Sequence, residues 1–152
     1  MTTAEARIGE LALDLPSPFP PAGEYVNVVR TGDLLVLGGH IPLGADGTLV
    51  LGKLGAELDV NAGRVAARLA ALSALASLRA ELDDLDLVRQ IVSLRGVVNA
   101  TPDFTQHTAV VDGASELFVT VFGECGRHAR LAVGVSSLPA NLALEIELIV
   151  QV

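Results

Sequence analysis

The 152-residue sequence is poor in the residue types on which several classes of protein depend. It holds one cysteine, Cys125, so neither an internal disulfide nor a cysteine-based zinc site can form. Tryptophan is absent and aromatic residues make up 3% of the chain, although 51% of it is hydrophobic. The core must therefore consist of leucine, valine, isoleucine and alanine, and one domain of this length is long enough to hold it.

The sequence also lacks a long uncharged apolar run. Its most apolar stretch, residues 60–82, is interrupted by Arg64, Arg68 and Arg79, which excludes the run of about 18 apolar residues typical of a membrane span. The first ten residues include Glu5 and no apolar segment, so we expect no secretory signal. We therefore expect a cytoplasmic protein. A small monomer has little room to hide so much apolar surface, which favours an oligomer.

Positive charge is scarce as well. Ten Lys or Arg residues face 18 Asp or Glu residues, which gives a formal net charge of −8, and the basic residues form no run. Such a chain repels a nucleic-acid backbone on average, so nucleic acid is not an expected partner, although a local arginine can still hold a small anion. His40, His107 and His128 lack the spacing of metal ligands, and we expect no metal site.

The hydrophobic pattern predicts one α+β domain over residues 1–152. Residues 1–20 form an N-terminal helix and a proline-rich lead-in, because the prolines exclude a central strand or helix. Strands are predicted at 25–30, 34–41, 48–52, 87–100, 129–137 and 142–152, and helices at 57–82 and 112–123. The order β-β-(β)-α-β-α-β-β predicts a mixed sheet with both helices on one face. A neighbouring subunit is expected to cover the other face.

The last two predicted strands carry the charges best suited to chemistry. Alternation along 129–137 places Arg130 among small residues, and alternation along 142–152 places Glu145 and Glu147 on one face. We expect these strands to be adjacent, so that an arginine and two carboxylates meet on an uncrowded surface. From alternation alone, a solvated face with a weak surface ion pair is the more common explanation.

A longer pattern favours a specific function. The segment from Gly126 to Glu147 contains GRHAR, then LP, then EIE, and it follows FTQH (104–107) and DGASELF (112–118). Upstream, GEY (23–25) and LGGHIP (37–42) extend the pattern. Together these motifs resemble the RidA/YjgF family of reactive-intermediate deaminases, formerly called L-PSP endoribonuclease-like. The resemblance covers roughly residues 20–152 and is greatest to a divergent branch with the G-R-H-A-R motif.

This resemblance implies a chorismate-mutase-like subunit in a homotrimer with three clefts between subunits. In the family's deaminases, an arginine at the position of Arg130 binds the carboxylate of a 2-imino or enamino acid. A glutamate at the position of Glu145 orients the attacking water, and a tyrosine at the position of Tyr25 lines the cleft. The products are a 2-keto acid and ammonia, and no cofactor is required. The residue types suit this chemistry, because a guanidinium grips a carboxylate through two hydrogen bonds and a carboxylate can move a proton.

Three further residues are candidates for binding the substrate. Gly38 stands where the deaminases usually have a small hydroxyl residue, and His40 stands where they often have an amide. His128 flanks the arginine strand, where it can act as an acid–base group or pack at the start of the strand. These differences leave open a non-catalytic trimer that binds small carboxylates or 2-keto acids. Ribonuclease activity is disfavoured by the negative charge and the scarcity of aromatic residues.

Overall fold

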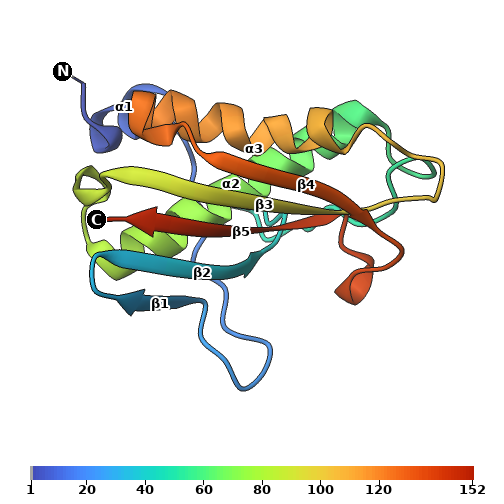
Figure 1. Cartoon of the computed structure of the whole chain (residues 1–152), viewed down its shortest axis with the longest axis horizontal. Helices are drawn as coiled ribbons and strands as arrows, with labels where there is room; N and C mark the ends of the chain where they lie inside the picture. Colours follow the sequence, from blue (N-terminus) through green and yellow to red (C-terminus); the bar gives the residue numbers. More distant parts are fainter. Residues whose placement is uncertain (1) are drawn as a thin grey trace.

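The alternating apolar residues of five segments form one mixed β-sheet in the computed structural model, which describes residues 2–152. The strands are β1 (Val28–Thr31), β2 (Leu34–His40), β3 (Gln90–Asn99), β4 (Ala129–Val135) and β5 (Leu144–Gln151). They lie in the order β1-β2-β5-β3-β4, and only β3 and β4 pair in parallel. Strand β4 is therefore an edge strand, and β3 separates it from β5 (Figure 1).

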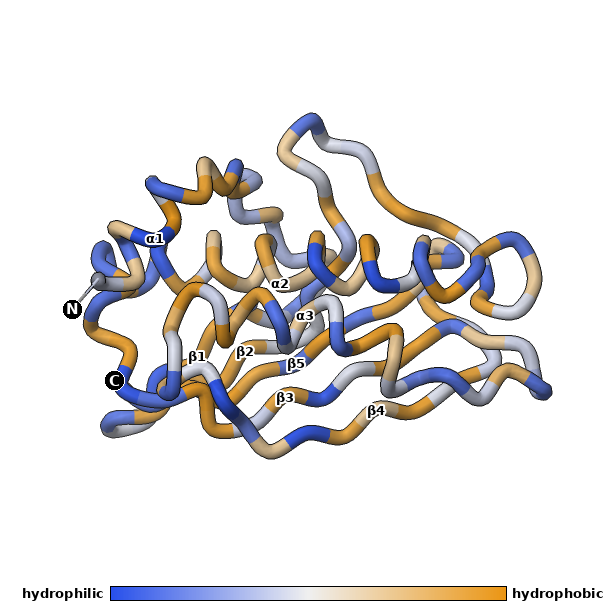
Figure 2. The backbone as a smooth tube through the Cα atoms, turned by 90° about the horizontal axis from the view of Figure 1, so that it is seen from above, coloured by the Kyte–Doolittle hydropathy of each residue, from blue (hydrophilic) through white to orange (hydrophobic). Residues whose placement is uncertain are grey.

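Two helices cover one face of this sheet and leave the other face open, and a third, short helix packs against the end of one of them (Figure 2). They are α1 (Ala4–Glu10), α2 (Val60–Leu82) and α3 (His107–Phe122). Asp59 caps the start of α2, with its side chain accepting a hydrogen bond from the Ala62 amide, and Asp83 follows the end of α2 in a left-handed conformation. The predicted α+β fold, with a mixed sheet and helices on one face, is confirmed. None of the helices described is long and apolar enough to cross a membrane.

Two predicted elements differ from the structure. The segment 48–52 forms no strand and makes only isolated bridges, one of which joins Leu51 to Leu142. Helix α3 begins at His107 rather than at Asp112. The carboxylate of Asp112 does not cap a helix because it binds a side chain of β4 instead. Val110 is fully buried in the added first turn, and this burial outweighs the low helix propensity of β-branched residues.

Small side chains allow the helices to lie close to each other and to the sheet. Helix α2 contributes a set of fully buried alanines, namely Ala66, Ala67, Ala70, Ala71 and Ala74. At Gly113 in α3, a Cβ atom would overlap the backbone carbonyl of Arg64 in α2. At Gly96 in β3, a Cβ atom would lie 2.5 Å from a methyl carbon of Val111. Helix α3 is thus packed against α2 and against β3 at contacts that only glycine permits.

We expect Gly113→Ala to lower the free energy of unfolding by roughly 1–3 kcal/mol, because the added methyl group must displace a backbone carbonyl. The direction of this change is informative. Where space allows, replacing a helical glycine by alanine raises the free energy of unfolding by about 1 kcal/mol, because alanine is the better helix former. Gly9→Ala in α1 is the matched control, because nothing lies within 4 Å of the added atom there. Urea denaturation measures both variants, and a Gly113→Ala protein as stable as the Gly9→Ala control would contradict this packing.

Candidate functional site

The pleat of the sheet separates the two residues expected to act together. Arg130 of β4 stands opposite Leu94 of β3, which is fully buried beneath the helices, whereas Glu145 of β5 stands opposite Val97. Because alternate residues of a strand point to opposite faces, Arg130 lies on the helix-covered face and Glu145 on the open face. The expectation that their strands are adjacent and share an uncrowded surface is wrong. Strand β3 lies between them, and the two side chains leave opposite faces.

Helix α3 holds Arg130 in place. One terminal nitrogen, Nη1, donates to the Asp112 carboxylate at 2.7 Å and to the Ser115 hydroxyl at 3.1 Å. The other, Nη2, donates to the backbone carbonyl of Thr108 at 3.3 Å. The Arg130 side chain is 18% exposed and that of Asp112 is 41% exposed. Three of the five N–H donors of the guanidinium therefore have partners within the described chain, and its charge is balanced.

The hydrogen bonds continue from Ser115 to His128. The Ser115 Oγ lies 2.9 Å from Nε2 of His128, and Nδ1 of His128 lies 2.7 Å from the carbonyl oxygen of Gly126. A carbonyl only accepts, so Nδ1 carries the proton and Nε2 accepts the hydroxyl proton of Ser115. Burial lowers the pKa of His128 below 6.5, and the positive charge of Arg130 lowers it further, although the bond to Gly126 opposes this shift. The imidazole is thus neutral near pH 7.

We call this group the α3–β4 cluster; it consists of Asp112, Ser115, Gly126, His128 and Arg130. Its members belong to the sequence motifs DGAS and GRHAR, so each motif supplies the hydrogen-bond partners of the other. A Cβ atom at Gly126 would overlap the backbone of Phe118, so the close approach of the turn to α3 also requires glycine. Much of the DGAS and GRHAR pattern therefore joins helix α3 to strand β4.

Glu145 occupies a different setting on the open face. A Cβ atom at Gly39 would lie 3.5 Å from the Glu145 carboxylate, so this glycine leaves space beside it. The amide of the neighbouring Gly38 donates to the carbonyl of Asn27 at 2.9 Å, which places the segment of Tyr25 at the same end of the sheet. The Tyr25 side chain is exposed. Burial raises the pKa of Glu145 above 4.5, and the nearby charge of Glu147 adds to the increase.

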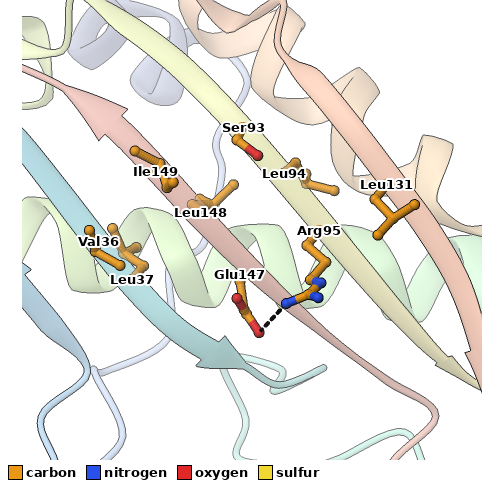
Figure 3. Close-up of a pocket in the computed structure, with 9 residues that line it drawn as sticks. All are labelled: Val36, Leu37, Ser93, Leu94, Arg95, Leu131, Glu147, Leu148 and Ile149. Atoms are coloured by element: carbon orange, nitrogen blue, oxygen red, sulfur yellow. Dashed lines mark ion pairs between the residues drawn. The ribbon is translucent and has the colours of Figure 1, made fainter.

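A shallow depression of about 340 Å³ lies farther along the open face (Figure 3). Its lining includes Val36, Arg95, Leu131 and Glu147. Arg95 and Glu147 form an ion pair there at 3.7 Å, drawn as the dashed line in Figure 3. Among residues 2–152, no lysine or arginine forms such a pair with Glu145. The two glutamates of the EIE motif therefore differ in their surroundings, and Glu145 is the one with an unpaired carboxylate.

His40 lies inside the domain. Its Nε2 lies 2.8 Å from the hydroxyl of Ser77 in α2, its Nδ1 lies 2.8 Å from the carbonyl of Gly38, and its ring meets Phe19 edge to face. The residue is 0% exposed, and burial lowers its pKa below 6.5. The structure thus places His40 between sheet and helix, where it joins β2 to α2, rather than on a surface that a ligand can reach.

Two residues that hold Arg130 in place are not identified from the sequence alone. Asp112 and Ser115 are three positions apart on α3, which places both on the helix side that faces β4. The DGAS motif contains this signal, but the sequence pattern predicts Asp112 at the start of a helix, whereas it lies inside α3. Within residues 2–152, no three His, Cys, Asp or Glu side chains are placed to hold a metal ion together.

Comparison with known proteins extends these observations. The family model described as "YjgF/chorismate_mutase-like, putative endoribonuclease" matches residues 5–151. Protein TCP17 from Trypanosoma cruzi is 42% identical over 96% of this chain and 92% of its own length. A crystal structure from Shewanella oneidensis, described as a "putative endoribonuclease", is 34% identical over 99% of both chains with a TM-score of 0.95. The YjgF protein of Escherichia coli is 25% identical over 91% of this chain and 93% of its own, with a TM-score of 0.62.

The two neutral histidines, the buried His40 and the half-buried His128, predict how stability depends on pH. Their folded pKa values lie below the unfolded value near 6.5, so the unfolded chain takes up protons first as the pH falls. The stabilisation that they provide is complete above pH 6.5 and is lost as the pH falls below it. We expect His128→Gln to reduce the loss of unfolding free energy between pH 7.5 and 5.5, measured by urea denaturation at each pH. An unchanged pH dependence in this variant would contradict a neutral His128.

Proposed function

Because this chain belongs to the YjgF/chorismate mutase-like family, we propose that it forms a homotrimer that hydrolyses small imines or enamines in clefts between its copies. The 2-imino and enamino acids of the family's deaminases are the starting expectation for the substrate. The observation that carries the proposal is the position of Arg130 and Glu145 on opposite faces of one sheet. No single chain can present both to one small molecule, so a shared site requires a second copy.

The open face supports assembly. Val29, Val36 and Leu131 lie on it and are 51%, 42% and 50% exposed, although each is a large apolar residue. Covering such surface is favourable at about 25 cal/mol per Å². Strand β4 is an edge strand and carries Arg130 at its helix-covered side. A ring in which the open face of one copy meets the β4 edge of the next closes with three identical clefts.

Glu145 has the properties of the acid–base group. Its carboxyl is half-buried, has no cationic partner among the described residues, and has a pKa raised by burial. A carboxylate in this state can orient water toward the carbon of a C=N bond and accept its proton. The same group can pass that proton to the nitrogen, which gives a carbinolamine. It can then carry the hydroxyl proton to the nitrogen as the C–N bond breaks, which releases the carbonyl product and ammonia or an amine. Two N–H donors of Arg130 without a partner in residues 2–152 remain to orient the substrate.

A binding protein without turnover is the second candidate. The observation that favours it is that neither histidine candidate lies beside Glu145 on the open face, since His40 is buried against Ser77 and His128 lies on the opposite face. Stabilisation of the protein by 2-keto acids without any imine hydrolysis would support this function. The net charge of −8 gives no support for ribonuclease activity.

The two glutamates of the EIE motif offer a matched test of catalysis. We expect Glu145→Gln to lower imine hydrolysis by at least about 100-fold, because it removes the proton-transfer group. Glu147→Gln removes the same charge one alternate position along the same face, where Arg95 pairs with it, and should retain most activity. Released ammonia is measured above the uncatalysed rate with 2-aminoacrylate and with an uncharged imine of similar size, both generated in the assay.

Equal activity of Glu145→Gln and wild-type protein on both compounds would exclude the proposed role of Glu145. Wild-type protein without activity on either compound would leave the binding function as the better account. Light scattering during size-exclusion chromatography reports the number of copies for each variant, so that a loss of assembly is distinguished from a loss of chemistry.

A further inference from the structure

Asp112 determines the charge of the ligand that Arg130 can accept. We infer that the cleft takes an uncharged carbonyl or imine compound, such as a carboxamide, ester or ketone, rather than a carboxylate. This inference rests on the proposed function, since it concerns the same cleft. It differs from the starting expectation in the substrate class, and it makes Asp112 a specificity-determining residue.

The ion pair between Arg130 and Asp112 is built into the helix–strand contact. The two side chains meet at 2.7 Å, and the guanidinium is the more buried of the two at 18% exposure. Ser115 binds the same nitrogen, Nη1, which fixes the plane of the guanidinium relative to α3. A hydrogen bond between charged groups of this kind is stronger than one between neutral groups. A ligand carboxylate must therefore compete with a carboxylate of the protein that is already in place.

The backbone of Asp112 cannot shift away from Arg130. Its neighbour Gly113 lies so close to α2 that a Cβ atom would overlap the carbonyl of Arg64. Val111, on the other side, packs against Gly96 of β3. The backbone on both sides of Asp112 is thus held by tight contacts. The fold therefore keeps a carboxylate within reach of Arg130.

Two further arginines of these surfaces have acidic partners, whereas Lys53 donates to the side-chain oxygen of Asn99 and to the carbonyl of Ser136. Arg95 on the open face pairs with Glu147, and Arg127 beside the cluster pairs with Glu124. His128 accepts a hydrogen bond from Ser115 at Nε2 and is neutral near pH 7. Glu145 adds negative charge whenever it is ionised. At Arg130, a carboxylate would meet a charge that Asp112 already balances, whereas a neutral oxygen can use the two remaining N–H donors of Arg130.

Pyruvate and pyruvamide test this inference, because they have nearly the same shape and differ in charge. Their dissociation constants are measured by calorimetry with the full-length assembled protein. We expect wild-type protein to bind pyruvamide at least as tightly as pyruvate. In Asp112→Asn, the preference should shift toward pyruvate by about tenfold or more, the size expected for a charged hydrogen-bonded group.

Glu116→Gln is the matched control, because Glu116 lies on the same helix and pairs with Arg64 instead. It should change the ratio of the two constants less than about twofold, as expected for an exposed pair. Asp112→Glu keeps the charge and should retain the wild-type preference. Thermal unfolding verifies that each variant is folded. If Asp112→Asn does not fold, the wild-type ratio and Asp112→Glu still test the inference.

Wild-type protein that binds pyruvate at least tenfold more tightly than pyruvamide would overturn the inference, as would an unchanged ratio in folded Asp112→Asn. Absence of binding of both compounds to wild-type protein would overturn it too. Measuring the binding of pyruvate and pyruvamide does not require turnover. Failure of this inference can therefore be distinguished from failure of the proposed hydrolysis. A protein whose hydrolysis depends on Glu145 but which prefers pyruvate would contradict only the ligand class. A protein that prefers pyruvamide but hydrolyses no imine would contradict only the proposed reaction.

Discussion

The close packing of helix α3 is the constraint on which the rest of the structure depends. At Gly96, Gly113 and Gly126, an added Cβ atom would lie closer than 3.0 Å to an atom of a neighbouring element or turn, a distance that real Cβ atoms essentially never show. These three positions hold α3 against β3, against α2 and against the turn that leads into β4. The side chains of α3 that face β4, Asp112 and Ser115, are therefore delivered to fixed places. The setting of Arg130 follows from this packing rather than from the strand alone.

As a consequence, the two candidate site residues, Arg130 and Glu145, lie on opposite faces of the sheet. On the helix-covered face, Arg130 is oriented and its charge is balanced by Asp112. On the open face, Glu145 is half-buried beside Gly39 and has a raised pKa. In the proposed function, each residue has a role that it cannot perform together with the other inside one chain. Exposed apolar residues on the open face favour a neighbouring copy there, and the proposed cleft between copies would bring the two halves together.

Most of the fold was predictable because alternation and helical spacing follow directly from burial. The strand segments, the long helix and the single helix-covered face all follow from where apolar residues recur. The order of the strands does not, since β5 enters between β2 and β3 through pairings that no local pattern encodes. The face of Arg130 was misjudged for a physical reason. Small residues next to it were interpreted as a sign of open space, whereas a Cβ atom at Gly134 would overlap the His107 ring of α3. Those residues are small because the space is filled.

A mixing experiment with Arg130→Ala and Glu145→Gln tests most directly whether the site needs two copies. Each variant alone should be inactive in imine hydrolysis. Unfolding and refolding an equal mixture should restore about a quarter of the wild-type activity, because about three quarters of random trimers are mixed and each then holds one intact cleft of three. Recovery of activity in mixed trimers would confirm that Arg130 of one copy serves Glu145 of another. A mixture that assembles into mixed trimers but stays as inactive as its two components would contradict the shared cleft.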